Sequence, residues 1–201
     1  MTSVFLTQPK LHDSVMVSVP EAMVYHQKLS ILVIAVEPDN IPAELSDRML
    51  VKTVQNAIHV LWLAHQPMHK IRNRYLSHPM VRWALADVAN YQWLFVLAAC
   101  GTMEYKYRYS RSFPFKVKTL SDHPHHLPSI NSDAVPPPQC IPEDYQVRQS
   151  VKRFHSWENT VTAHRQYYFW EQHSQRETWT KRHLPQWVHR YRQEWGDCGL
   201  L

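Results

Sequence analysis

One short segment of this sequence alternates aromatic rings with positive charges. It reads EYKYRYSR from residue 104 to residue 111. Cations beside flat rings suit a nucleic acid, because the cations pair with phosphates while the rings stack on bases. A helix whose tyrosines pack inward and whose cations stay solvated would contain the same residues. The segment therefore predicts a nucleic-acid contact, with Lys106, Tyr107 and Arg108 as its candidate residues.

Positive charge is concentrated in the middle of the chain. Residues 47–118 contain eleven Lys and Arg against three Asp and Glu, whereas residues 1–46 contain two against five. Residues 119–147 contain no Lys or Arg and four acids. A regional excess of cations is typical of a surface that binds nucleic acid, although a basic face that only keeps a protein soluble gives the same composition. The charge pattern therefore indicates an acidic partner.

Other kinds of chemistry find little support in the residue pattern. Three glycines leave no glycine-rich phosphate loop. Cys100, Cys140 and Cys198 are far apart and form no CxxC pair, which indicates a reducing compartment rather than a disulfide scaffold or a zinc ribbon. The histidines between residues 123 and 126 have no cysteine or acid at ligand spacing. We therefore expect no metal site and no cofactor.

No segment has the pattern of a membrane span or a secretory signal. The longest apolar run, from Leu29 to Val36, is far too short to cross a bilayer. The N-terminus has no basic region followed by an apolar run. We therefore expect a soluble, cytoplasmic protein without a membrane partner.

Helical periodicity predicts three long helices, over residues 46–65, 78–100 and 143–175. Ser46 and Ser77 are suitable N-caps for the first two. Gly101 suits the left-handed position that ends the second, and a short basic-aromatic helix would follow it. The β-branched residues of 29–36 fit either a buried strand or a continued helix.

These elements predict a mainly α-helical protein that forms one compact domain. An irregular N-terminal segment occupies 1–45, and a basic helical core occupies 46–110. A long proline-rich loop follows at 111–141, because proline cannot continue a regular helix. The C-terminal helices occupy 142–201.

Short motifs are spread over most of the chain, in a definite order. They are Asp47-Arg48 with Lys52, His78-Pro79 with Trp83, Asn90-Tyr91 with Trp93-Leu94, the block from Glu104 to Tyr109, the block from Pro142 to Tyr145, Arg165 with Tyr167-Tyr168 and Glu171, and Trp179 with Arg182, Pro185 and Trp187. In this order and spacing the chain resembles a group of small phage proteins labelled pyrimidine dimer DNA glycosylases, which are distantly similar to the phage enzyme endonuclease V.

The resemblance implies base removal from DNA by an amine nucleophile. The opening MTSVFLT resembles the start of endonuclease V, which implies that the α-amine of Thr2 attacks the sugar once the initiator methionine is removed. The family also places a carboxylate beside the amine. Counting from Asp47 puts Gln55 at that position, and Met49 where the family has a histidine. Gln55 cannot accept a proton, so Asp47 or Glu104 would have to substitute.

The resemblance and the charge pattern together predict a DNA-binding surface. Its candidate residues are Arg48, Lys52, Arg72, Arg74, His78, Asn90, Trp93, Lys106, Tyr107, Arg108, Arg165, Tyr167 and Arg190. We expect DNA rather than RNA, and an enzyme that must expose a lesion from the base stack needs rings beside cations. The alternatives are a binding protein that has lost catalysis on the same scaffold, a protein that binds a host factor, and an enzyme that acts on a nucleotide or modified base. A small pocket formed by Asn90, Glu104 and Arg165 would favour the nucleotide.

Overall fold

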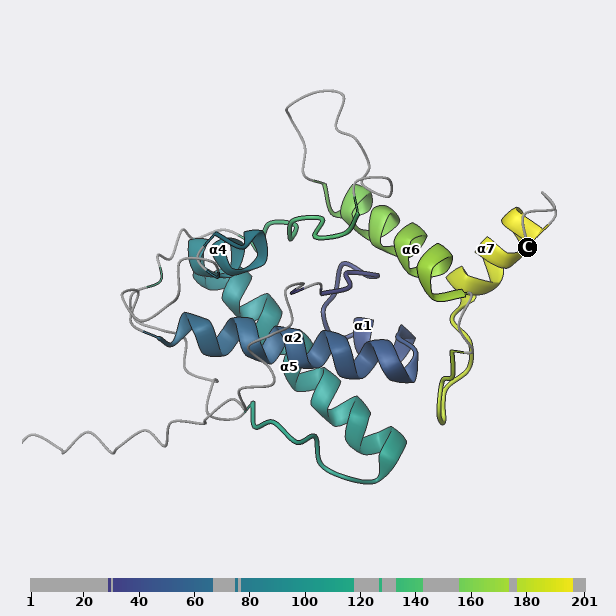
Figure 1. Ribbon diagram of the computed structural model, residues 1–201, viewed down its shortest axis with the longest axis horizontal. Coiled ribbons are helices and arrows are strands. Elements are labelled where there is room, and N and C mark those ends of the chain that lie inside the picture. Colours follow the sequence, from purple (N-terminus) through teal and green to yellow (C-terminus); the bar gives the residue numbers. More distant parts are fainter. Residues whose placement is uncertain are drawn as a thin grey trace, which may run out of the picture.

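The computed structural model describes residues 29, 31–66, 75, 77–117, 127, 133–142, 156–173 and 177–196. This part of the chain is mainly α-helical and compact, as the sequence predicts (Figure 1). The helices are α1 (Ile41–Glu44), α2 (Asp47–Ala64), α4 (Pro79–Ala86), α5 (Val88–Tyr109), α6 (Trp157–His173) and α7 (Gln186–Gly196). The segment before residue 29, parts of the proline-rich stretch (118–126 and 128–132) and the first part of the helix expected at 143–175 lie outside the described residues.

Helix α2 begins and ends close to the predicted boundaries. Ser46 is its N-cap, and its Oγ accepts a hydrogen bond from the amide of Met49 at 3.4 Å. The apolar side of α2 is buried where it crosses α5, including Leu50, Val54 and Leu61 (Figure 1). The two helices α2 and α5 therefore form the centre of the core.

The helix predicted at 78–100 is in fact two helices, α4 and α5. Asp87 separates them with an extended backbone (φ −155°, ψ 145°), and its carboxylate accepts a hydrogen bond from the amide of Ala89 at 2.7 Å. This bond caps α5, and apolar periodicity alone does not reveal it. His78, rather than Ser77, caps α4, because its Nδ1 accepts a hydrogen bond from the amide of Met80 at 3.2 Å.

The prediction that Gly101 ends the helix is wrong. Helix α5 runs through Gly101 to Tyr109 as one element, and Ser110 takes the left-handed position after it with φ 55°. Gly101 is buried, and a Cβ built there would collide with the Val54 side chain on α2. The missing side chain therefore lets α5 approach α2 closely instead of ending the helix.

Residues 31–34 are neither the strand nor the helix that the sequence left open. Their side chains are fully buried, but the backbone has no regular hydrogen-bond pattern. The carbonyl of Ile34 accepts a hydrogen bond from Arg165 Nε at 2.7 Å, and the carbonyl of Val36 accepts one from Trp93 Nε1 at 3.0 Å. Side chains of α6 and α5 thus satisfy backbone groups that a strand or helix would pair.

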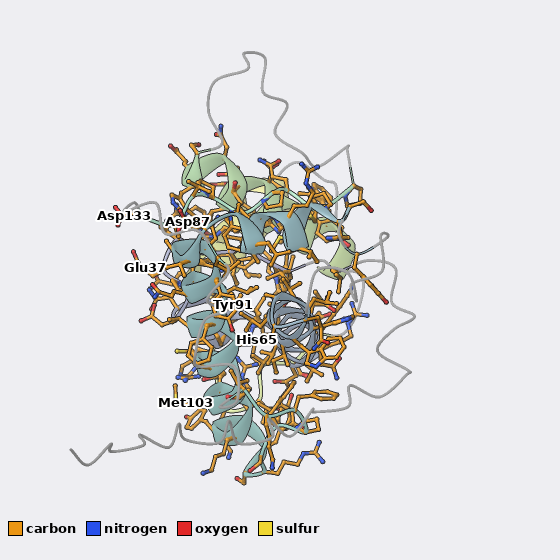
Figure 2. All side chains as sticks on the ribbon, turned by 90° about the vertical axis from the view of Figure 1, so that its left-hand side faces the viewer. Glu37, His65, Asp87, Tyr91, Met103 and Asp133 are labelled. Carbon is orange, nitrogen blue, oxygen red and sulfur yellow. The ribbon has the colours of Figure 1, made fainter. Side chains whose placement is uncertain are left out.

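Helices α6 and α7 complete the described structure on the side of α1 (Figure 1). The backbone amide of Ser46 donates a hydrogen bond to the Tyr168 hydroxyl at 3.0 Å, and Trp157 of α6 contacts Trp93 of α5. At the other end of α2, His65 Nε2 and the Tyr91 hydroxyl lie 2.7 Å apart (Figure 2). Among the described helices, none is both long enough and apolar enough to span a membrane.

Replacing Gly101 by Ala tests the close approach of α2 and α5. In an open helix this change stabilises by about 1 kcal/mol. Here we expect a destabilisation of about 1–3 kcal/mol, measured by urea unfolding, because the new methyl group overpacks the contact with Val54. In the Gly101→Ala/Val54→Ala double variant the loss should be smaller than the sum of the two single losses. A Gly101→Ala protein more stable than the wild type would contradict the contact.

Candidate nucleic-acid interface

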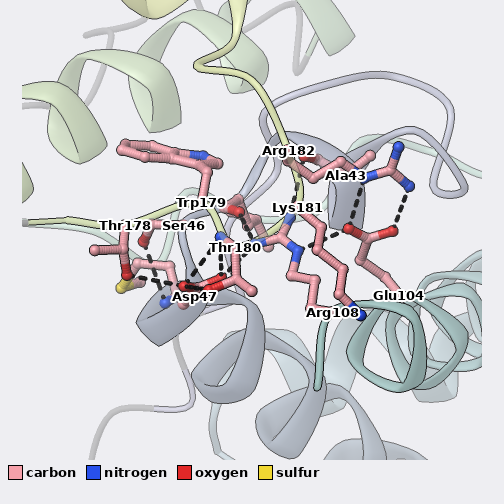
Figure 3. Close-up of polar contacts among 12 residues, drawn as sticks. Ala43, Ser46, Asp47, Glu104, Arg108, Thr178, Trp179, Thr180, Lys181 and Arg182 are labelled. Atoms are coloured by element: carbon pink, nitrogen blue, oxygen red, sulfur yellow. Dashed lines mark hydrogen bonds and ion pairs between the residues drawn. The ribbon is translucent and has the colours of Figure 1, made fainter. Parts of the chain in front are cut away.

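The most deeply buried charge in the described structure is the guanidinium of Arg108. Its side chain is 0 % exposed, and its N–H groups all have acceptors (Figure 3). Nε donates to Glu104 at 2.7 Å, and Nη1 donates to the Leu45 carbonyl at 2.8 Å and to Asp47 at 3.0 Å. Nη2 donates to the carbonyls of residues 42 and 43, each at 3.1 Å. Arg108 therefore joins the end of α1, the start of α2 and the end of α5.

Asp47 connects this cluster to a segment more than a hundred residues later. Besides Arg108, its carboxylate accepts hydrogen bonds from the hydroxyls of Thr178 at 2.8 Å and Thr180 at 2.7 Å, and from the Thr180 amide at 3.0 Å (Figure 3). Burial raises the pKa of Asp47, but the bonds from Thr180, Thr178 and Arg108 outweigh it and leave the pKa below its usual 3.8. Asp47 is thus a fixed anion that holds residues 178–180 against α2.

Glu104 is shared by two arginines. Arg182 donates to both of its oxygens, through Nε at 2.9 Å and Nη2 at 2.7 Å, while Arg108 donates to one of them (Figure 3). Burial raises the pKa of Glu104, but hydrogen bonds from Arg182 and Arg108 and their charges outweigh it and leave the pKa below its usual 4.5. A carboxylate held ionised in this way is poorly suited to exchange a proton during catalysis.

The same segment places two cations on an exposed ring. Tyr107 is 51 % exposed, and the Arg182 guanidinium lies 4.6 Å and the Lys181 ammonium 5.6 Å from its ring centroid. Lys181 has φ 58°, and its Nζ donates to the Tyr107 carbonyl at 2.8 Å and to the hydroxyl of Ser110 at 3.2 Å. Two cations therefore lie against the ring of Tyr107, and cation–π attraction stabilises this arrangement.

Several cations are exposed on α2, at the end of α5 and on residues 177–182. We call this surface the basic junction. It consists of Arg48, Lys52, Lys106, Tyr107, Arg111, Lys181 and Arg182. Arg48 reaches the segment through an ion pair with Glu177 at 3.2 Å. The junction combines residues from the middle of the sequence with Lys181 and Arg182 from near its end, neither of which was among the predicted contact residues.

Several predicted contact residues lie elsewhere, and the structure corrects their roles. Arg108 has no donor left for a phosphate, because each of its N–H groups is used inside the fold. Trp93 is buried with its indole N–H donated to Val36, so its ring is unavailable to stack on a base. Asn90 is also buried, and its amide bonds the Trp83 carbonyl and the Val135 amide, each at 3.0 Å.

The remaining predicted residues are dispersed. Arg165 lies beside α1, where it pairs with Glu44 at 3.8 Å and stacks on Trp187 with 5.3 Å to the ring centroid. Tyr167 is half-buried on α6, and Arg190 is exposed on α7. His78 is half-buried as the cap of α4, where burial lowers its pKa. Thr2, Arg72 and Arg74 lie outside the described residues.

The residues that would form a nucleotide pocket do not converge. Asn90 and Glu104 are fourteen positions apart on the continuous helix α5, which separates them by about 21 Å along its axis. Glu104 already accepts hydrogen bonds from Arg108 and Arg182. Arg165 already donates to the Ile34 carbonyl, pairs with Glu44 and lies against the Trp187 ring. Within the described residues, no group of three His, Cys, Asp or Glu side chains is placed to hold a metal ion.

Comparisons of the chain with protein-family models, with curated proteins and with solved structures give no match. The resemblance to the glycosylase family thus stays a prediction from the motifs.

Sequence reasoning found part of the cluster and missed the rest. Glu104 and Arg108 are four residues apart on one helix, the spacing at which opposite charges pair. For Glu104 the sequence favours an ion pair over a catalytic role. For Asp47, the first residue of α2, it favours a charge that stabilises the helix end over a catalytic role. The approach of Arg182 and Thr180 could not be foreseen, because no local pattern relates them to positions so far away.

Replacing Arg108 by Met tests the importance of the buried charge. Removing the guanidinium takes this donor from the carbonyls of residues 42, 43 and 45 and removes one cation from each of Asp47 and Glu104, so we expect a loss of about 3–5 kcal/mol in the free energy of unfolding. Arg82→Met is the matched control, since Arg82 is exposed on α4 and its replacement should change the free energy of unfolding by no more than about 0.5 kcal/mol. Equal losses in the two variants would contradict the assignment.

The pH dependence of stability tests the ionised state of Glu104. Its pKa is lower in the folded than in the unfolded protein, so the stability it contributes is complete above its unfolded pKa and is lost as pH falls through the folded pKa. The difference in unfolding free energy between wild type and Glu104→Gln should therefore be largest near neutral pH and shrink below about pH 4.5. A difference that does not change with pH would refute the ion pairs.

Proposed function

We propose that this protein binds DNA through the basic junction. The observation that carries the proposal is the position of two exposed cations, Lys181 and Arg182, against the exposed ring of Tyr107. Phosphates would pair with Lys52, Lys106 and Arg111, and Tyr107 would stack against a base or a sugar. DNA rather than RNA follows from the resemblance to glycosylases that act on DNA.

The charge balance at the junction supports a polyanion as the partner. Asp47 and Glu104 are the nearest acids on α2 and α5, and both are turned inward to Arg108. In the described part of the chain, Lys106 and Lys181 have no carboxylate partner. The buried cluster thus fixes the backbone beneath the surface while leaving an excess of positive charge outside, which attracts phosphates over long distances.

Binding to a short duplex, followed by fluorescence anisotropy at several salt concentrations, tests the proposal. Each phosphate contact contributes a slope of about −0.9 to the plot of log affinity against log salt. The Lys106→Ala/Arg111→Ala double variant should bind more weakly and reduce the magnitude of the slope by about 1.8. An affinity that barely changes with salt would overturn the proposal.

A matched control removes the same charge from distant places. Arg82 is exposed on α4 and Arg192 is exposed on α7. The Arg82→Ala/Arg192→Ala double variant has the same net charge as the Lys106→Ala/Arg111→Ala variant, so it separates a local contact from a general effect of charge. This control variant should keep the wild-type slope of log affinity against log salt. Equal losses in the two double variants would show that binding does not involve the basic junction.

The described residues favour binding without base removal. Gln55 is half-buried on α2 and carries no charge, while Glu104 is held as an anion by two arginines. Neither side chain can both accept and return a proton, as a lyase acting through an amine requires.

Borohydride trapping on DNA that contains an abasic site tests this part of the proposal. We expect no covalent protein–DNA adduct under conditions where binding is complete. An adduct whose formation depends on a free amine at Thr2 would instead establish the lyase that the resemblance implies.

A further inference from the structure

Large apolar side chains that are exposed in the described structure gather along one helix. They are Val36, Val96, Met103, Tyr107 and Val135. Three of them belong to α5, and Met103 is 62 % exposed. The other two are attached to α5 by hydrogen bonds, from Trp93 to the Val36 carbonyl and from the Val135 amide to Asn90, each at 3.0 Å. They therefore border a single face rather than being scattered.

This face is the side of α5 that points away from α2. Its exposed or half-buried residues are Ala89, Gln92, Val96, Ala99, Cys100 and Met103. Apart from Cys100, successive positions are separated by three or four residues, the spacing of a seam along which one helix packs on another. Ala89 and Ala99 are small enough to let a second helix approach. We call this face the apolar stripe.

Acidic side chains border the stripe toward the N-terminal end of α5. Glu37 follows Val36, and Asp133 precedes Val135 by two residues; both acids are exposed. Figure 2 shows Glu37, Asp87 and Asp133 near one end of α5, with Met103 further along the helix.

Cations border the stripe at its other end. Lys106 is exposed one turn after Met103, and Tyr107 carries Lys181 and Arg182 against its ring. The stripe thus has an acidic end and a basic end. The distance from Asn90 to Tyr107 along the axis of α5 is about 26 Å.

We propose that the apolar stripe pairs with the same stripe of a second copy of this chain, with the two α5 helices antiparallel across a two-fold axis. Ala99 lies near the axis, and Val96 packs against Met103 of the second copy. Lys181, which lies against the ring of Tyr107, then faces the segment of the second copy that contains Glu37. Each acidic end meets a basic end, and the contact occurs twice because the interface is isologous.

The charge distribution selects a second copy over other occupants. A parallel pair would bring like charges together at both ends, which disfavours that arrangement. A purely basic helix from another protein would match the acidic end and be repelled by the basic one. Only a partner with the same two ends, in reverse order, satisfies both, and this chain is such a partner.

The size of the face limits the strength of the pairing. Helix α5 has 22 residues and is about 33 Å long, so a pair of such faces lies at the small end of specific interfaces. We therefore expect a reversible dimer with a dissociation constant on the order of 10 µM.

Sedimentation velocity of the full chain across this concentration range, in low salt and without DNA, is the first measurement. The wild type should change from monomer to dimer as concentration rises, and Met103→Glu should stay monomeric. Arg192→Glu, which alters an exposed charge on α7, should dimerise like the wild type. Circular dichroism should confirm that each variant is folded. A wild type that remains monomeric would overturn the proposal, even if it binds a helical peptide through this face.

Charge reversal at the two ends gives a sharper test. The Glu37→Lys chain and the Lys181→Glu chain should each stay monomeric, because their ends repel in a self-pair. Mixed in equal amounts they should form a heterodimer, since both contacts then join opposite charges. Failure of the mixture to dimerise would overturn the antiparallel arrangement. The result does not depend on DNA binding, because no nucleic acid is present.

Discussion

The buried guanidinium of Arg108 is the interaction on which the described structure depends. A charge in the interior is tolerated only when hydrogen bonds replace its water, and here every N–H group has an acceptor. Three acceptors are backbone carbonyls of residues 42, 43 and 45, at and just after the end of α1. A helix of four residues cannot satisfy its own terminal carbonyls, so Arg108 completes it from α5.

This arrangement also determines which charges remain outside. Asp47 and Glu104 are held by Arg108 and by the segment 178–182, and Glu104 also pairs with Arg182, an exposed cation of the basic junction. Positive charge without a carboxylate partner in the described residues is carried at the junction by Lys106 and Lys181.

The sequence was sufficient for features that depend on local patterns. Ser46 as a cap, the apolar side of α2 and the helical class of the protein follow from hydrogen-bonding side chains and periodicity. It was insufficient wherever a distant contact overrides a local preference. Glycine often ends a helix, yet Gly101 lies inside α5, where the helix packs closely on Val54 of α2. Arg108 and Trp93 are of residue types that often contact nucleic acid, yet both are buried. Glu104, four residues before Arg108, indicates an ion pair for Arg108, whereas no local pattern indicates that Trp93 is buried.

Residues 178–182 are attached to the helices mainly through carboxylates, hydroxyls and an ammonium group. The segment also carries Trp179, which packs against the core and donates its indole N–H to the Glu44 carbonyl at 3.2 Å, so detachment would expose one large ring to water. Lys181 also has a left-handed backbone without being glycine, a conformation whose strain the contacts of this segment must offset. Release of the segment would remove Lys181 and Arg182 from the ring of Tyr107.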